Sequence, residues 1–133
     1  MTPEDLSSIL VKNIMSTPLI SVNPVTTVFQ IAKMMEQGGV GAIIVKENGI
    51  PVGIVTDRDF AIKLSAKNLS FDTPVEKIMS SPLITINPDE SISSAAKIIS
   101  SKKIRKLAVS ENGQIIGIIT STDLVNQIAK HLK

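Results

Sequence analysis

Hydrophobic and polar positions follow two different periods along this chain, and the change of period predicts its helices and strands. Between Val28 and Met35 the apolar residues recur with the 3.6-residue period of a helix that buries one face, and Gly38-Gly39 is expected to end that helix. Short, mostly apolar runs before and after it are typical of strands. The first half therefore reads strand, helix, strand, strand, helix, over residues 19–22, 26–38, 42–45, 52–56 and 57–66.

The same order returns in the second half, displaced by a constant 64 residues. No gap is needed to keep the two halves in register, which indicates an internal duplication. Among the matching segments are Ile14-Met15-Ser16 with Ile78-Met79-Ser80, Glu47-Asn48-Gly49 with Glu111-Asn112-Gly113, and Gly53–Thr56 with Gly117–Thr120. The second half predicts a strand over 83–86, a helix buried through Ile92, Ala95, Ala96 and Ile99, a hairpin that turns at Asn112-Gly113, and a last helix over 122–132.

Helix-start signals at Thr2-Pro3-Glu4-Asp5 predict a short helix ahead of the first repeat. We expect residues 1–66 to hold this helix and repeat 1, residues 67–75 to be a short linker, and residues 76–133 to form repeat 2. So short a linker favours repeats that pack on each other. The expected fold class is α/β, with two pseudo-symmetric β-α-β-β-α repeats packed through their sheets, since each sheet is too small to bury both faces alone.

Composition narrows the possible functions. The formal net charge is only +2 and the chain has three Phe and no Trp or Tyr, which argues against a surface that binds nucleic acid by charge and stacking. Cysteine is absent, and no apolar run approaches the 18 residues of a membrane span. The N-terminus does not look like a signal peptide, so the expectation is a soluble cytoplasmic protein without contact to a membrane.

In each repeat a predicted strand ends at a threonine, and an aspartate follows three residues later. These pairs are Thr56 with Asp59 and Thr120 with Asp123. One interpretation is a capping box that only starts the next helix. The other is a ligand site, because ligands in α/β proteins lie beyond the carboxyl ends of strands. A carboxylate can accept from both hydroxyls of a ribose, while a threonine hydroxyl and helix N–H groups can hold a phosphate.

These residues resemble a known family. The duplicated units, with Met-Ser-Thr-Pro at 15–18 and the glycine-to-aspartate motifs at 53–59 and 117–123, look like a pair of cystathionine-β-synthase (CBS) domains, known as a Bateman module. The resemblance covers about Val11 to Ile128. It implies that an adenosine ligand such as AMP, ADP, ATP or S-adenosylmethionine binds in a cleft between the two repeats.

The resemblance also assigns expected roles to residues. Asp59 and Asp123 would hold ribose, and Thr56 and Thr120 would contact phosphate. The other expected ligand contacts are Lys103, Ile104 and Arg105 before a strand of repeat 2, Val40 at the matching place in repeat 1, Ile20 and Ile84 against adenine, and Ser16 and Ser80 at the rim. Repeat 1 has Gly41 where repeat 2 has Arg105, so the two sites cannot be equivalent. The tighter site is expected at Thr120, Asp123 and Arg105.

The favoured function is a regulatory sensor that acts on a partner protein or by forming a homodimer. No nucleophile with a base, carboxylate pair or metal cluster has catalytic spacing, so we expect neither an enzyme nor a bound metal or cofactor beyond the regulatory ligand. Two alternatives remain open. One is a nucleic-acid-binding accessory that uses the basic run 102–106, and the other is a structural dimeric adaptor whose capping boxes bind nothing.

Overall fold

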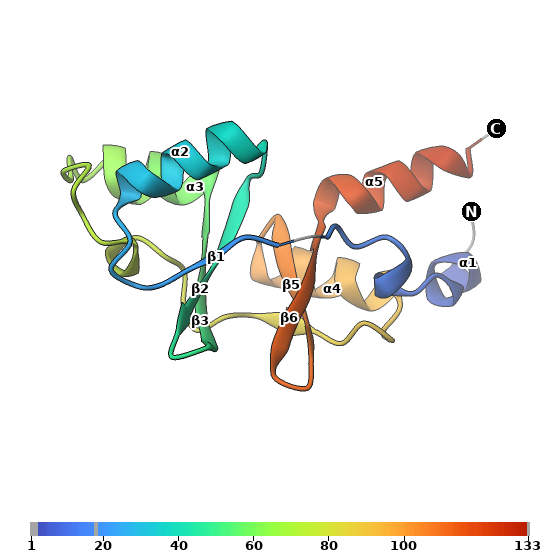
Figure 1. Cartoon of the computed structure of the whole chain (residues 1–133). Helices are drawn as coiled ribbons and strands as arrows, with labels where there is room; N and C mark the ends of the chain where they lie inside the picture. The colour runs from blue at the N-terminus through green and yellow to red at the C-terminus, as the bar shows by residue number, and fades with distance from the viewer. Residues whose placement is uncertain (1–2, 18, 133) are drawn as a thin grey trace. The chain divides into compact units, whose positions relative to one another are not determined.

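The computed structural model describes residues 3–17 and 19–132, so the cap expected at Thr2 and the turn expected at Pro18 lie outside the described residues. The chain forms two compact units (Figure 1). Unit 1 combines the described part of Met1–Leu19 with that of Ile84–Lys133, and unit 2 is Ile20–Leu83. Each unit holds one three-stranded sheet together with helices, which confirms the α/β class and the duplication.

Unit 2 contains a sheet in the order β1-β2-β3, in which β1 is parallel to β2 and β2 is antiparallel to β3. A short 3-10 turn, η3, closes the unit after the last helical segment. The elements of unit 2 are β1 (Ser21–Val22), α2 (Val28–Gly38), β2 (Ala42–Glu47), β3 (Ile50–Thr56), α3 (Asp57–Asp59), η2 (Phe60–Ser65) and η3 (Val75–Lys77).

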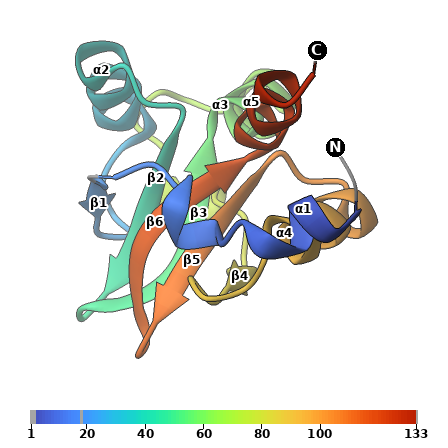
Figure 2. The same ribbon diagram turned by 90° about the vertical axis from the view of Figure 1, so that its right-hand side faces the viewer.

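Unit 1 repeats this arrangement with the order β4-β5-β6 and the same parallel and antiparallel pairings. The leading helix exists as expected, and it lies beside α4 (Figure 2). The elements of unit 1 are α1 (Pro3–Ser8), η1 (Val11–Asn13), β4 (Thr85–Ile86), α4 (Ile92–Lys102), β5 (Lys106–Glu111), β6 (Gln114–Thr120) and α5 (Ser121–Lys130).

Local signals in the sequence account for the helix ends and the hairpin turns. Thr27 starts α2 with a reciprocal capping box, and Gly39 ends it in the left-handed region at φ 63°. In both hairpins an Asn-Gly pair has positive φ at both positions, the geometry of a two-residue type I′ turn. Lys103 stands at the place of Gly39 in repeat 2 and has φ 55°, a left-handed conformation that a side chain disfavours.

Three details differ from the sequence-based expectations. The first strand of each repeat is only two residues long, because β1 and β4 pair with just two residues of their neighbours. Ala96 is exposed, so the buried face of α4 consists of Ile92, Ala95 and Ile99. The helix after β3 begins as α3 and continues from Phe60 to Ser65 with the wider π-helical turn, whereas its counterpart α5 is α-helical throughout.

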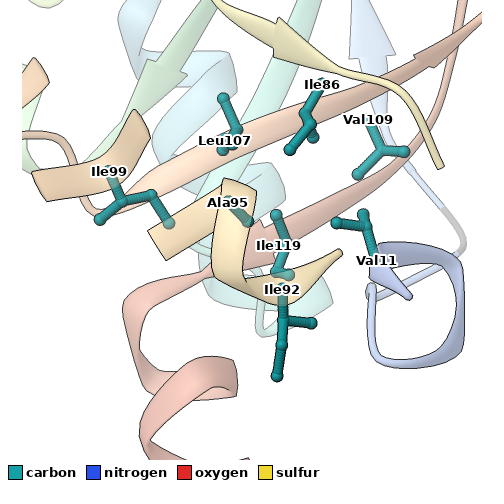
Figure 3. Close-up of a cluster of buried hydrophobic side chains, with 8 residues drawn as sticks. All are labelled: Val11, Ile86, Ile92, Ala95, Ile99, Leu107, Val109 and Ile119. Atoms are coloured by element: carbon teal, nitrogen blue, oxygen red, sulfur yellow. The ribbon is translucent and has the colours of Figure 1, made fainter. Parts of the chain in front are cut away.

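The segment ahead of the first strand of each repeat packs into the core of the other repeat. Val11 precedes the first strand of repeat 1 yet is fully buried among the side chains of α4, β5 and β6 (Figure 3). Val75, its counterpart 64 residues later, is fully buried in the core formed by α2, β2 and β3. Backbone hydrogen bonds hold these segments, from Val11 N–H to Glu90 O at 2.8 Å and from Val75 N–H to Thr26 O at 2.8 Å. The compact units therefore do not coincide with the sequence repeats.

Both motif glycines face a methionine of such a segment, and substitution there should destabilise the fold. A Cβ atom at Gly53 would lie 2.7 Å from Met79 Sδ and 2.9 Å from the backbone oxygen of Ser80. At Gly117 the three nearest atoms all belong to the Met15 side chain, with Sδ at 2.5 Å. A flexible methionine can move, whereas a hydrogen-bonded backbone cannot move cheaply. We expect Gly53→Ala to lower the free energy of unfolding by about 1–3 kcal/mol.

Chemical denaturation of Gly53→Ala and Gly117→Ala checks this expectation. Gly117→Ala serves as the matched control and should cost less, because only a side chain must give way. Equal losses in the two variants would show that the Ser80 backbone contact does not decide the outcome.

Candidate ligand-binding site

In unit 1 the expected site residues of repeat 2 lie at one end of the sheet. Thr120 ends β6 opposite Lys106, the first residue of β5, and Ser121 N–H donates to Arg105 O at 2.9 Å. Ser16 exchanges two backbone hydrogen bonds with Ile118, at 2.8 and 3.1 Å. The structure thus brings Ser16 and Arg105 to the strand end that carries Thr120.

The other expected residues of repeat 2 border the same end. Ile84 directly precedes β4, which runs parallel to β5, and its half-buried side chain packs against the core of unit 1. Ile104 also packs against that core, whereas Lys103 and Arg105 are exposed. The end of the sheet therefore has aliphatic side chains close to two exposed cations.

Asp123 forms a complete capping box with Thr120 and still has hydrogen-bonding capacity. Thr120 N–H donates to Asp123 Oδ2 at 2.8 Å, and Asp123 N–H donates to Thr120 Oγ1 at 3.1 Å. Across the described residues, Asp123 Oδ1 accepts no hydrogen bond and Asp123 has no ion-pair partner. An ionised carboxylate offers about four acceptor positions, so most of this capacity is unused.

An open cavity of about 610 Å³ borders the half-buried Asp123 side chain. It is polar, with three side-chain amides and one lysine among its lining groups. The lining residues are Asn13, Ile14, Asp123, Asn126, Gln127, Ala129 and Lys130. Sequence reasoning did not single out this cavity, because it joins η1 to α5, segments more than a hundred residues apart in the chain.

In unit 2 the corresponding carboxylate is buried and fully engaged. Asp59 is only 5% exposed. Its Oδ2 accepts from Thr56 N–H at 2.9 Å and from Thr56 Oγ1 at 3.3 Å. Its Oδ1 accepts from Ser80 Oγ at 3.2 Å and lies 3.2 Å from Lys63 Nζ. Asp59 therefore contacts two other expected site residues, Thr56 and Ser80, and also Lys63, which the sequence patterns did not single out.

The remaining expected residues of repeat 1 lie at the same sheet end. Ile44 N–H donates to Ile20 O at 3.0 Å, and Ser80 exchanges hydrogen bonds with Ile54 at 2.8 and 3.1 Å. Val40 comes two residues before β2, and both Val40 and Ile20 pack against the core of unit 2. Each unit thus gathers its own set of expected site residues, and each set includes a serine from the segment ahead of the other repeat's first strand.

Within residues 3–17 and 19–132, no group of three His, Asp or Glu side chains could hold a metal ion. The described helices are all too short or too polar to cross a membrane.

Together, the duplicated sheets and the strand-end carboxylates define a tandem α/β repeat protein. The family model for the CBS domain matches residues 11–66 and 75–130. The chain belongs to the CBS domain family and is a CBS domain pair. It is 37% identical over 120 residues to the Bacillus subtilis CBS domain-containing protein YhcV, which covers 90% of this chain and 86% of that protein. The chain spans 63% of the length of a second curated relative and 25% of the length of a third.

Solved structures share the fold over nearly the whole chain. An uncharacterised conserved protein from Pyrococcus horikoshii superimposes with a TM-score of 0.87 at 29% identity, covering 96% of this chain and 97% of that one. The CBS domain pair of protein MJ0100, solved in complex with 5′-methylthioadenosine and S-adenosyl-L-methionine, has a TM-score of 0.83 at 29% identity. That alignment covers 92% of this chain and 98% of the other.

Proposed function

We propose that this CBS domain pair is a regulatory sensor that binds an adenosine-containing ligand, such as AMP, ADP, ATP or S-adenosylmethionine, at the Asp123 end of unit 1. The observation that carries the proposal is the unused acceptor capacity of Asp123 beside an open cavity. The relative MJ0100, similar over 92% of this chain, binds two adenosine compounds and supports the ligand class. Binding rather than catalysis is the function that this site supports.

Each group at this end has a chemical role in the proposed complex. Asp123 Oδ1 accepts from the ribose hydroxyls, a charge-assisted contact stronger than one between neutral groups. Thr120 Oγ1 and the N-terminus of α5 favour an anion. The exposed Arg105 can pair with a phosphate or carboxylate through two parallel hydrogen bonds. The half-buried Ile84 offers the apolar contact that a purine base needs.

The output of the sensor is proposed to pass through self-association. Helix α5 has no buried residue, and Val125 and Ile128 on it are 60% and 42% exposed. These positions are three residues apart and therefore lie on one face of the helix. A homodimer could cover this face, or an effector protein could bind it. Ligand binding would then change the extent of this association, provided that the ligand binds the associated and the free protein with different affinities.

One observation favours the alternative of a structural adaptor without ligand. The Thr120–Asp123 box is already complete, so helix capping by itself explains why these residue types stand there. The variant Asp123→Asn separates the two functions, because the amide oxygen can still cap while the negative charge that favours ribose is lost.

Thermal unfolding with added ligands tests the proposal. At about a hundred times its dissociation constant, a ligand should stabilise the wild type by about 2.7 kcal/mol, a shift of several degrees. AMP, ADP, ATP, S-adenosylmethionine and NAD form the panel. The shift should disappear in Asp123→Asn and persist in Asp72→Asn, which changes the same group at an exposed site. Absence of any shift, with Asp123→Asn as stable as the wild type, would favour the adaptor.

A further inference from the structure

The carboxylates of Asp59 and Asp123 differ in how many hydrogen-bond acceptor positions remain free for a ligand. Asp59 accepts two hydrogen bonds on Oδ2 and contacts Ser80 and Lys63 through Oδ1. Asp123 has one acceptor contact in the described part of the chain, from Thr120 N–H to Oδ2. A carboxylate has about four acceptor positions, so those of Asp59 are filled and those of Asp123 are largely open.

Lys63 supplies the one charged contact among the three that Asp59 has and Asp123 lacks, the others being Thr56 Oγ1 and Ser80 Oγ. Its Nζ lies 3.2 Å from Asp59 Oδ1, 3.3 Å from Met79 O and 3.4 Å from Ser80 Oγ. The ammonium therefore ties the carboxylate to the segment ahead of the first strand of repeat 2. In repeat 2 the matching position is Gln127, which carries no charge and lines the open cavity next to Asp123.

We propose that Lys63 closes the Asp59 carboxylate to ribose hydroxyls, so that the chain binds one adenosine ligand, at Asp123, and not two. This inference rests on the proposed function and makes Lys63 a specificity-determining residue. A ribose at Asp59 would have to displace an ammonium ion and a serine hydroxyl from a buried carboxylate. The ribose hydroxyls carry no positive charge, so this exchange would break the ion pair at 3.2 Å and leave the Lys63 ammonium without its carboxylate.

Calorimetric titration with 5′-methylthioadenosine tests the proposal by stoichiometry. This probe has the ribose diol but no phosphate or carboxylate to attract Lys63 away from Asp59. We expect one molecule per chain for the wild type and two for Lys63→Gln, which installs the residue of repeat 2. Lys63→Arg keeps the ion pair and should still bind one. The double variant Lys63→Gln with Asp59→Asn should return to one, which locates the added site at Asp59.

The reverse exchange provides an independent arm. Gln127→Lys gives Asp123 the lysine that Asp59 has, and binding at the remaining site should weaken at least tenfold. This arm also decides the matter if Lys63→Gln proves too unstable to titrate. A wild type that binds two molecules equally, or a folded Lys63→Gln that still binds one, would overturn the role of Lys63 while leaving the sensor intact. A wild type and a Lys63→Gln variant that bind no adenosine compound would instead contradict the proposed function.

Discussion

Replacing Val11 with aspartate is expected to unfold repeat 2 selectively, although Val11 belongs to repeat 1 in the sequence. Val11 begins η1, and its side chain is fully buried in the core of α4, β5 and β6. An uncompensated charge in such a position costs about 3–5 kcal/mol. Hydrogen exchange measured segment by segment should show a greater loss of protection in β5 and β6 than in β2 and β3.

Milder and matched variants keep this test interpretable if Val11→Asp does not fold. Val11→Ala should lower stability by about 2 kcal/mol with the same regional pattern, since burying a valine contributes about 1.5–3 kcal/mol. Val75→Ala should show the opposite pattern, with the loss in β2 and β3. Val25→Asp is the control, because Val25 is 68% exposed. Loss of protection in β2 and β3 after Val11→Ala would contradict the exchange of segments between the repeats.

Asp59→Ala and Asp123→Ala are expected to damage different properties of the protein. Asp59→Ala removes the acceptor of two Thr56 donors and of Ser80, and leaves Lys63 without its carboxylate. Since the Lys63 side chain is 32% exposed, water recovers part of this loss, and the expected cost is about 3 kcal/mol. Asp123→Ala removes only the acceptor of Thr120 N–H, one half of the capping box, at about 0.5–2 kcal/mol.

Ligand affinity should rank the two variants in the opposite order. Asp123→Ala removes the proposed ribose acceptor, and a lost hydrogen bond to a charged group costs about 1.5–3 kcal/mol of binding. Asp59→Ala should leave the affinity at Asp123 close to that of the wild type. Denaturant unfolding and calorimetric titration of both variants measure the two properties separately. Equal losses of stability would show that the contacts of Lys63 and Ser80 with Asp59 contribute little.

Sequence patterns predicted the elements that depend on neighbouring residues. Asn48-Gly49 and Asn112-Gly113 specify their turns because both positions need positive φ, and Thr27 and Gly39 mark the ends of α2. The partner of each leading segment was not predictable in this way. Met15 contacts Gly117, and Met79 contacts Gly53. Because both repeats have a methionine and a glycine at these positions, the residue types alone do not say which methionine packs against which glycine. Only the path of the folded chain decides between them.

At the candidate site, the sequence predicted which carboxylates stand at the strand ends but not how they differ. The spacing of four residues between Asp59 and Lys63 is a recognised signal for an ion pair on a helix. That signal could have been read, whereas the contribution of Ser80, 21 residues away, depends on tertiary pairing. The roles of the twelve expected ligand contacts remain predictions, and the geometry now makes those at Asp123 the first to test.

The measurement that tests the central claim most directly is a calorimetric titration of the wild type and Asp123→Asn with S-adenosylmethionine and with AMP. We expect at least one of these compounds to bind the wild type with a defined stoichiometry of one per chain. The same compound should bind Asp123→Asn at least tenfold more weakly, while the melting temperatures of the two free proteins stay within a few degrees. Equal affinity in the two proteins would contradict an adenosine site at Asp123, and so would the absence of binding to both.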